Sequence, residues 1–377
     1  MSEVGSQVYL LNFQFNQDQS CFSLATSQGF RTFTLQPLAE FSRRQVNEPE
    51  GQAAPVQLAA MLFQTNYVAL VLKSSPYKVL LWDDSLRQKP LELWSRFEVL
   101  NVLLRRDVLC IVSEYKIYIY EFGSFQVIMH LETSGNPRGV CALAPGSRPW
   151  LLAAPAQTKG VIRLQNGSDD AASQDIIAHN NPIACIALSL DGGMVATASE
   201  QGTVVKVFSV SDGKQLFAFR RGTTSTTISS LCFRPDSKFV AVGSISATVH
   251  IFRLEADLSS SGNQGRVPQY FQATRSFAQF RLPDVDANGK PSVDLRFGAG
   301  NFLSGPVVAF SKGDAEKIVV LHYNGILYQG NFNEKIQPTA DNFFTEATVV
   351  FAARPDFQVG ASSKPPREDD EGNWQVI

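Results

Sequence analysis

Strand-length apolar runs recur along this chain at a nearly constant distance, and this periodicity limits the folds open to it. Cys141, Cys185 and Cys232 each lie in such a run, spaced 185 − 141 = 44 and 232 − 185 = 47 positions apart. After Cys185 and Cys232 the same order follows: a turn containing Asp, a second apolar run and a third one. A repeat of about 40–45 residues with several short strands per copy is typical of β-propeller blades.

The other apolar runs have the same character. They are rich in Val, Ile, Leu, Phe and Tyr, are broken by turn residues, and include 8–15, 68–72, 79–82, 108–112 and 117–120. Short runs of this kind are typical of strands, and no convincing long amphipathic helix accompanies them. Small sheets that are apolar on both faces must bury them against neighbouring sheets, so one unit cannot stand alone.

Seven groups of strands can be distinguished in the sequence. We therefore predict an all-β protein, a single seven-bladed β-propeller of the WD-repeat kind over residues 1–363. The main alternative is a pair of β-sandwiches, which a period sustained through three adjacent copies disfavours. The prediction depends on strand spacing, because Trp82-Asp83 is the only Trp-Asp dipeptide.

Charge and hydropathy exclude several classes of protein. Lys and Arg number 33 and Asp and Glu 35, for a formal net charge of −2. Such a chain has no global attraction to nucleic acid or to anionic membranes, so any anion binding needs a local cluster. No apolar stretch approaches the roughly 18 residues of a membrane span, and the N-terminus lacks the pattern of a secretory signal.

The cysteines indicate a reducing compartment. They are five in number, form no CxxC pair and lie in or beside apolar runs: Cys21, Cys110, Cys141, Cys185 and Cys232. We predict reduced core thiols of a cytosolic protein, and neither disulfides nor zinc ligands.

The most informative short stretch is Phe219-Arg220-Arg221-Gly222, which ends a predicted strand over 215–219. Successive side chains of a strand point to opposite faces. Arg220 and Arg221 are therefore expected to face two different gaps, one toward the preceding blade and one toward the following blade.

Polar residues flank both gaps at matching positions in two copies of the repeat. The offsets are constant, since 244 − 199 = 45 and 248 − 203 = 45. The set is His179, Ser199, Thr203 and Lys206 for the first gap, and Ser244, Thr248 and His250 for the second. Guanidinium binds phosphate in a bidentate manner, and hydroxyls and imidazole add hydrogen bonds, so two phosphate sites are predicted. The alternatives are a solvated end for the Arg pair, turn-stabilising Ser and Thr, and internal packing of His179.

Residues 179–254 resemble the PROPPINs, the phosphoinositide-binding propellers that include the WIPI proteins of autophagy. Their FRRG motif is present as Phe219–Gly222, and 196–203, 248–252, 15–22 and 81–84 also match, so the resemblance extends over nearly the whole chain. It implies two headgroup pockets on the propeller rim, for phosphatidylinositol 3-phosphate and the 3,5-bisphosphate. By this resemblance the first pocket contains His179, Ser199, Thr203, Lys206 and Arg220, and the second contains Arg221, Gly222, Ser244, Thr248 and His250. Family members commonly carry Arg at the position of Lys206, and Lys lacks the bidentate fork, so weaker binding is expected in the first pocket.

Two segments depart from the strand pattern. The segment 255–275 is too long for a hairpin turn and occupies the position of the family's membrane-inserting loop, in a short form with Val267, Tyr270 and Phe271 as the insertable residues. Packing of Tyr270 and Phe271 back on the propeller is an equally open alternative. Residues 364–377 contain Pro365-Pro366 and the acidic run 368–371, and we predict a disordered acidic tail.

The sequence also bears on partner binding and on catalysis. Asn16 and Asp18 resemble the family surface that contacts an autophagy-related lipid-transfer partner, although Asn-Gln-Asp is also a common hairpin turn. The sequence has no Gly-rich phosphate loop, no HExxH and no GxSxG, so we expect no enzymatic activity, no cofactor and no metal.

The resulting functional hypothesis is a cytoplasmic monomer that binds phosphoinositide membranes and recruits autophagy factors. The resemblance implies peripheral attachment to phagophore (preautophagosomal), endosomal or vacuolar membranes, and nucleic acid binding is not expected. The alternative is a protein-interaction WD-repeat scaffold without direct lipid binding. That alternative would allow Arg220 or Arg221 to be ion-paired with a carboxylate.

Overall fold

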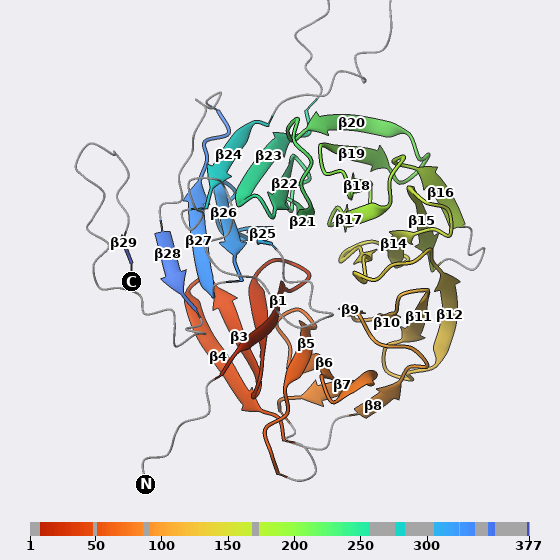
Figure 1. The fold of residues 1–377 in the computed structure, drawn as a ribbon, viewed down its shortest axis with the longest axis vertical. Helices are drawn as coiled ribbons and strands as arrows, with labels where there is room; N and C mark the ends of the chain where they lie inside the picture. The colour runs from red at the N-terminus through yellow and green to blue at the C-terminus, as the bar shows by residue number, and fades with distance from the viewer. Residues whose placement is uncertain are drawn as a thin grey trace, which may run out of the picture.

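Seven sheets follow one another along the chain and are arranged radially around a central axis (Figure 1). The computed structural model describes residues 8–47, 51–85, 91–167, 173–255, 276–282, 305–323, 325–335, 346–350 and 375–376. Each sheet consists of consecutive strands, with the first strand nearest the axis and the fourth at the outer rim. The predicted seven-bladed β-propeller is therefore confirmed, and the pair of β-sandwiches is excluded.

The strands of the first four blades are as follows. Blade 1 comprises β1 (Leu10–Phe15), β2 (Cys21–Thr26), β3 (Gly29–Leu35) and β4 (Leu38–Gln45); blade 2 comprises β5 (Val56–Met61), β6 (Tyr67–Leu72), β7 (Ser75–Asp83) and β8 (Leu91–Trp94); blade 3 comprises β9 (Asn101–Leu104), β10 (Val108–Val112), β11 (Lys116–Glu121) and β12 (Val127–Glu132); blade 4 comprises β13 (Ala142–Leu143), β14 (Leu151–Pro155), β15 (Val161–Asn166) and β16 (Ser173–Ile177).

The last three blades continue the same order. Blade 5 comprises β17 (Ile183–Leu188), β18 (Met194–Ser199), β19 (Val204–Ser209) and β20 (Gln215–Arg220); blade 6 comprises β21 (Ile228–Phe233), β22 (Phe239–Ser244), β23 (Thr248–Arg253) and β24 (Ala278–Arg281); blade 7 comprises β25 (Val307–Phe310), β26 (Lys317–Leu321), β27 (Ile326–Asn331), β28 (Glu346–Val349) and β29 (Gln375–Val376). Neighbouring strands are antiparallel, except that β29 pairs with β28 in parallel.

The hydrophobic core is divided among the gaps between blades. The second strand of each blade is buried along nearly its whole length on both faces, as small stacked sheets require. Among the described residues, seven clusters of buried side chains each join two neighbouring blades. One of them packs Phe22 and Leu24 of blade 1 against Val319 and Leu321 of blade 7, so apolar packing closes the ring.

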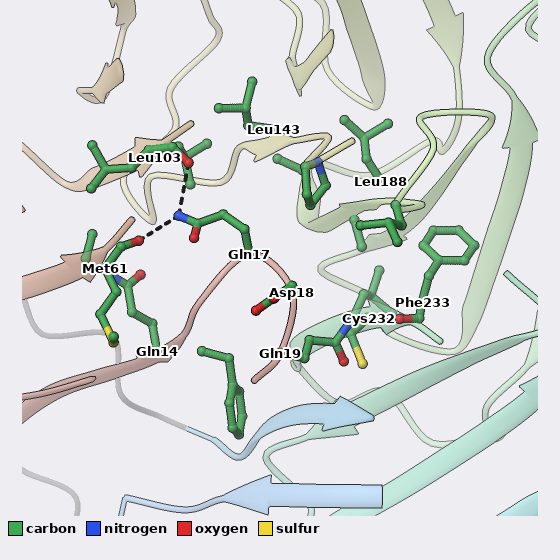
Figure 2. A pocket seen from close by; sticks show the side chains of 18 of the residues that line it. Gln14, Gln17, Asp18, Gln19, Met61, Leu103, Leu143, Leu188, Cys232 and Phe233 are labelled. Carbon is green, nitrogen blue, oxygen red and sulfur yellow. Dashed lines mark hydrogen bonds between the residues drawn. The ribbon is translucent and has the colours of Figure 1, made fainter. Parts of the chain in front are cut away.

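The loop between β1 and β2 carries side chains that contact several other blades (Figure 2). The side-chain amide of Gln17 donates hydrogen bonds to the carbonyl oxygens of Met61 (2.6 Å) and Leu104 (3.0 Å), in blades 2 and 3. Gln19 reaches the opposite side and donates to the carbonyl of Phe233 in blade 6 at 3.0 Å. The loop borders a mainly apolar cavity of about 290 Å³. It therefore links blades that the chain order keeps apart.

The structure bears on the predictions for the cysteines, for the membrane loop and for the tail. All five cysteines are free, Cys21 and Cys110 are buried, and burial raises the pKa of the Cys110 thiol to about 12. Most of the predicted membrane loop, with Val267, Tyr270 and Phe271, lies outside the described residues, as do 364–374 and 377 of the predicted tail. The prediction of a disordered tail is wrong for 375–376, because backbone pairing with β28 makes these two residues a strand of blade 7. No described helix has the length and apolarity needed to cross a bilayer.

Candidate anion-binding site

Arg220 is the last residue of β20 and Arg221 follows it, and the register of the strands gives the directions of both side chains. Directly opposed residues of antiparallel strands share a face, and Arg220 is opposite Val204. On the same face of β19, the ammonium of Lys206 donates a hydrogen bond to the carbonyl of Ala178 in the linker after blade 4, at 2.7 Å. Arg220 therefore faces blade 4.

Arg221 continues the opposite face of the strand. Phe219, two residues earlier and on the same face, packs in the cluster between blades 5 and 6. The centroid of its ring lies 4.8 Å from that of Phe252, and the two rings are stacked. The backbone N–H of Arg221 donates to the carbonyl of Thr203 at 2.9 Å, which extends the ladder by one residue. The two arginines therefore face different gaps, in agreement with the predicted alternation.

The gap between blades 4 and 5, here called the first cleft, contains Arg220, Lys206, His179, Thr197 and Ser199. Thr197 is opposite Lys206 in the sheet, and its hydroxyl lies 3.0 Å from Nε2 of His179. Burial, with the positive charge of Lys206, lowers the pKa of His179 to about 4. The imidazole is therefore neutral at pH 7 and can exchange hydrogen bonds as donor or acceptor.

Thr197 was not predicted from the sequence. It lies inside an apolar strand, where a threonine is indistinguishable from a residue that merely favours β structure. Its contact with His179 comes from a linker eighteen residues away in the chain. The internal packing role left open for His179 is therefore present, and it fixes the ring beside Lys206.

The gap between blades 5 and 6, the second cleft, contains Arg221, Ser244, Thr248 and His250. The hydroxyls of Ser244 and Thr248 are 3.0 Å apart. His250 is only 5 % exposed, and its Nδ1 has no hydrogen-bond partner among the described residues. Burial, with the charge of Arg221, lowers the pKa of His250 to about 4. A buried polar atom without a partner costs free energy, so Nδ1 of His250 is a candidate hydrogen-bonding group for a ligand.

Arg221 is held in place by backbone oxygens. Its Nε donates to the carbonyl of Gly202 at 2.9 Å, and its Nη2 donates to the carbonyl of Thr224. A Cβ added to the neighbouring Gly222 would meet no atom within 4 Å, so the space beside that glycine is open.

The predicted equivalence of Thr203 and Thr248 is not found in the structure. Ser199 and Ser244 both end their strands, but β19 begins at Val204 and β23 at Thr248, an offset of 248 − 204 = 44. The turn before β19 has one more residue and contains Gly202 at φ +63°. Thr248 thus corresponds to Val204, and membership of Thr203 in the first pocket stays a prediction.

The offset of 44 also makes Lys206 and His250 equivalent positions in blades 5 and 6. Lys206 and His250 are each the third residue of their strands. Both side chains face the preceding blade. The first cleft therefore has the ammonium of Lys206 where the second cleft has the imidazole of His250.

Arg281 occupies in blade 6 the position of Arg220 in blade 5. Arg220 is opposite the first residue of β19, and Arg281 is opposite the first residue of β23. Its neighbour Phe280 packs toward blade 7, so Arg281 faces the second cleft, and it is exposed. The repeated Phe-Arg pair was a usable signal, but the spacing of 281 − 220 = 61 hides it from a search with a period near 45.

The equivalent position in blade 4 carries an apolar residue. Ile177 is opposite Val161, the first residue of β15, and it is 81 % exposed. Its neighbour Ile176 packs toward blade 5, so Ile177 is on the opposite face of the strand, which is turned toward blade 3.

Arg220 and Arg221 differ from other arginines of the chain in their ion pairing. Across the part of the chain that the structure describes, neither Arg220 nor Arg221 forms an ion pair with a carboxylate. Other arginines of the chain do, such as Arg44 with Asp84 and Arg163 with Asp175. Within the same residues, no group of three His, Cys, Asp or Glu side chains is arranged to hold a metal ion.

The residues predicted to contact a protein partner serve the fold. Asn16 is 5 % exposed, and its Oδ1 accepts hydrogen bonds from the N–H groups of Ser20 and Cys21. Asp18 is ion-paired with Lys312 at 2.7 Å. The hairpin-turn alternative is therefore present, and the contact with a partner stays a prediction.

Comparison with known proteins assigns the family. Residues 9–275 match the family model described as PROPPIN. The chain belongs to the PROPPIN family. Autophagy-related protein 18 of Aspergillus terreus is 35 % identical to this PROPPIN over 303 residues, 73 % of this chain and 70 % of the relative. The protein of the same name from Neosartorya fischeri is 34 % identical over 360 residues, 88 % and 81 % of the two chains.

Solved structures of the same fold agree with this assignment. Kluyveromyces lactis Hsv2 superimposes with a TM-score of 0.70 at 23 % identity, over 89 % of this PROPPIN and 97 % of that chain. A chain in the complex of KlAtg21 with the coiled-coil of AgAtg16 gives a TM-score of 0.70 at 20 % identity, over 91 % and 100 %. At these identities the likeness concerns the fold alone.

Proposed function

We propose that this PROPPIN attaches to membranes by binding phosphoinositide headgroups, phosphatidylinositol 3-phosphate or the 3,5-bisphosphate, in the first and second clefts. The observation that carries the proposal is the placement of Arg220 and Arg221. They are adjacent in the chain, face different clefts, and have no carboxylate partner among the described residues. A guanidinium without a carboxylate partner at a rim is suited to a phosphate ligand.

Each cleft offers a complementary set of groups. In the first cleft, Arg220 and Lys206 supply positive charge, and the neutral His179 and the hydroxyl of Ser199 supply hydrogen bonds. In the second, Arg221 and Arg281 supply charge, and His250, Ser244 and Thr248 supply hydrogen bonds. Each hydrogen bond to a charged phosphate contributes about 1.5–3 kcal/mol. The first cleft has one guanidinium and one ammonium, so we expect it to be the weaker of the two.

Two clefts on one rigid rim increase the avidity of a monomer. Once one headgroup is bound, the second binding event is intramolecular and its effective concentration is high. Ile177 lies on the same rim and can contact the apolar edge of the headgroup layer, with the predicted loop residues Val267, Tyr270 and Phe271 as a further contact. Stable attachment generally needs two kinds of signal of this sort.

We further propose that the membrane-bound propeller recruits autophagy factors at phagophore, endosomal or vacuolar membranes. The named relatives are autophagy-related proteins, and a structural neighbour, KlAtg21, was solved with the coiled-coil of AgAtg16. A propeller attached by the rim of blades 4 to 6 leaves its two flat faces and its other blades accessible to such partners.

The test is a vesicle flotation assay with the double variant Arg220→Thr/Arg221→Thr. We expect binding to vesicles that contain phosphatidylinositol 3-phosphate to be lost, with no change in the thermal unfolding midpoint beyond a few degrees. The matched control is Arg43→Thr/Arg106→Thr, which removes the same charge from exposed positions in blades 1 and 3. If the folded double variant floats like the wild type, direct lipid binding is refuted and the WD-repeat scaffold is the better description.

A further inference from the structure

The segment after β20 carries a chemical feature that headgroup binding does not use. Residues 222–227 read Gly-Thr-Thr-Ser-Thr-Thr, and Thr223, Thr224 and Ser225 are all exposed. The segment forms no strand and lies between the outer strand of blade 5 and the inner strand of blade 6. Three exposed hydroxyls in irregular backbone next to Arg220 and Arg221 are accessible to a modifying enzyme.

The three hydroxyls differ in their surroundings. The Oγ of Ser225 donates a hydrogen bond to the carbonyl of Gln201 at 2.9 Å. The carbonyl of Thr224 accepts from Arg221, which fixes the backbone there. The hydroxyl of Thr223 has no hydrogen bond within the described residues, and it follows Gly222, beside which the space is open. The hydroxyl of Thr224 likewise has no hydrogen bond among these residues, so Thr223 is distinguished from it by the open space beside Gly222.

The arginine pair stands at a defined distance before Thr223. The chain has three Arg-Arg pairs, at 43–44, 105–106 and 220–221, and only the last has a hydroxyl residue two positions after its second arginine. Basic residues three and two positions before the acceptor are the pattern read by basic-directed protein kinases, whose acidic substrate grooves pair with guanidinium groups.

We propose that Thr223 is a phosphorylation site for a basic-directed, ATP-dependent protein kinase, and that the modification weakens membrane binding; the second part rests on the proposed function. The Oγ1 of Thr223 attacks the γ-phosphorus of ATP, and the bond from that phosphorus to the β–γ bridging oxygen breaks. ADP leaves, and the hydroxyl proton passes to the catalytic carboxylate of the kinase.

The phosphothreonine acts on the same arginines that the headgroups need. It carries a charge of about −1.5 to −2 at neutral pH, two residues from Arg221 and three from Arg220. Its oxygens pair in place of a lipid phosphate with the guanidinium of Arg221, which already reaches the carbonyl of the neighbouring Thr224. Its charge also repels an anionic membrane surface. The modification therefore opposes lipid binding in both clefts.

The modification site is tested without any membrane. The full chain is incubated with cAMP-dependent protein kinase and ATP, and the phosphate is located by peptide mass spectrometry. We expect incorporation at Thr223, none at that position in Thr223→Ala, and unchanged incorporation in the matched variant Thr224→Ala. Absence of phosphate at Thr223 in the wild type overturns the proposal.

The effect on binding is tested by flotation with vesicles that contain phosphatidylinositol 3-phosphate. We expect the phosphorylated chain to bind at least about tenfold more weakly, phosphatase treatment to restore binding, and kinase treatment to leave Thr223→Ala unaffected. Equal binding of both forms overturns the regulatory part. If the untreated chain binds no better than Arg220→Thr/Arg221→Thr, the lipid function and its regulation both fail, while the incorporation assay still decides the modification site.

Discussion

The ammonium of Lys312 and the carboxylate of Asp18 are 2.7 Å apart, although 294 residues separate them in the chain. Burial opposes ionisation of Asp18, but the hydrogen bonds from Lys312 and Ser20 outweigh it and hold the pKa of this carboxyl below its ordinary value. The pair lies where blade 1 meets blade 7. The described sheets exchange no strand across this junction, so side chains and apolar packing must close the ring.

Gln19 is expected to contribute more to this closure than the ion pair. Its amide donates to the carbonyl of Phe233, and its oxygen accepts from the N–H of Phe310 at 2.6 Å. Gln19→Ala leaves both backbone groups unpaired in a partly buried place and should lower the free energy of unfolding by about 2–3 kcal/mol. Lys312 is largely exposed, so Lys312→Ala should cost at most about 1 kcal/mol. Urea unfolding at pH 7 compares the two, and equal losses would contradict the assignment.

Arg281 provides a test of the equivalence between blades 5 and 6. Arg281→Ala removes a guanidinium from the second cleft and should weaken binding to phosphatidylinositol 3-phosphate vesicles by about tenfold, the equivalent of one charge-assisted hydrogen bond. The side chain is exposed, so stability should change by less than about 0.5 kcal/mol. Arg106→Ala, an exposed arginine of blade 3, serves as the control. Unchanged binding of Arg281→Ala would place this residue outside the site.

Sequence reasoning gave the architecture because each blade is a local unit. The strands of one blade are consecutive in the chain. Their apolar runs, turns and spacing can therefore all be recognised within a single stretch of about 45 residues. The opposite directions of Arg220 and Arg221 follow from the alternation of side chains along one strand, which is also a local property.

The missed features all depend on contacts between units. The sequence indicates that Gln17 and Gln19 are turn residues, because nothing in it shows that their side chains reach Met61 in blade 2 and Phe233 in blade 6. Arg281 was missed because a long segment within blade 6 breaks the period. The turn before β19 is one residue longer than its counterpart, and a constant numerical offset concealed this difference.

Ile177 tests whether the rim touches lipid. Ile177→Asp places a charge at a position that is already 81 % exposed, so the free energy of unfolding should change by less than about 0.5 kcal/mol. If the residue enters the interfacial layer, vesicle binding should fall about tenfold, whereas binding of a soluble inositol phosphate headgroup should be unchanged. Ile128→Asp, an exposed residue of β12, is the matched control. Equal flotation of both variants would show that the rim at blade 4 stays in water.

Gly202 is expected to be required for the shape of the second cleft. It has φ +63°, and a Cβ there would collide with the carbonyl oxygen of Thr226. Gly202→Ala should therefore destabilise the fold by about 1–3 kcal/mol. It should also displace Arg221, whose Nε is held by the Gly202 carbonyl. Gly222→Ala is the matched comparison for stability, because its Cβ meets nothing within 4 Å. Urea unfolding and flotation of both variants test this, and an unperturbed Gly202→Ala would contradict it.

His250 should make stability depend on pH in a defined direction. Its pKa is about 4 in the folded protein and 6.5 for an ordinary histidine. Between these values the unfolded chain binds more protons than the folded one, so the free energy of unfolding falls as pH decreases from about 6.5 toward about 4. At pH 5 the loss from this one residue should be about 2 kcal/mol relative to pH 7.5.

His250→Asn isolates this contribution, because asparagine does not titrate and every carboxylate is retained. Urea unfolding of wild type and variant at pH 7.5 and pH 5 should show a smaller loss for the variant. Parallel losses would mean that His250 is charged or solvated in the folded protein, which its exposure of 5 % opposes. A bound phosphate would stabilise the imidazolium and raise this pKa. Adding a soluble headgroup should therefore reduce the difference between wild type and variant, and it would do so only if the ligand occupies the second cleft.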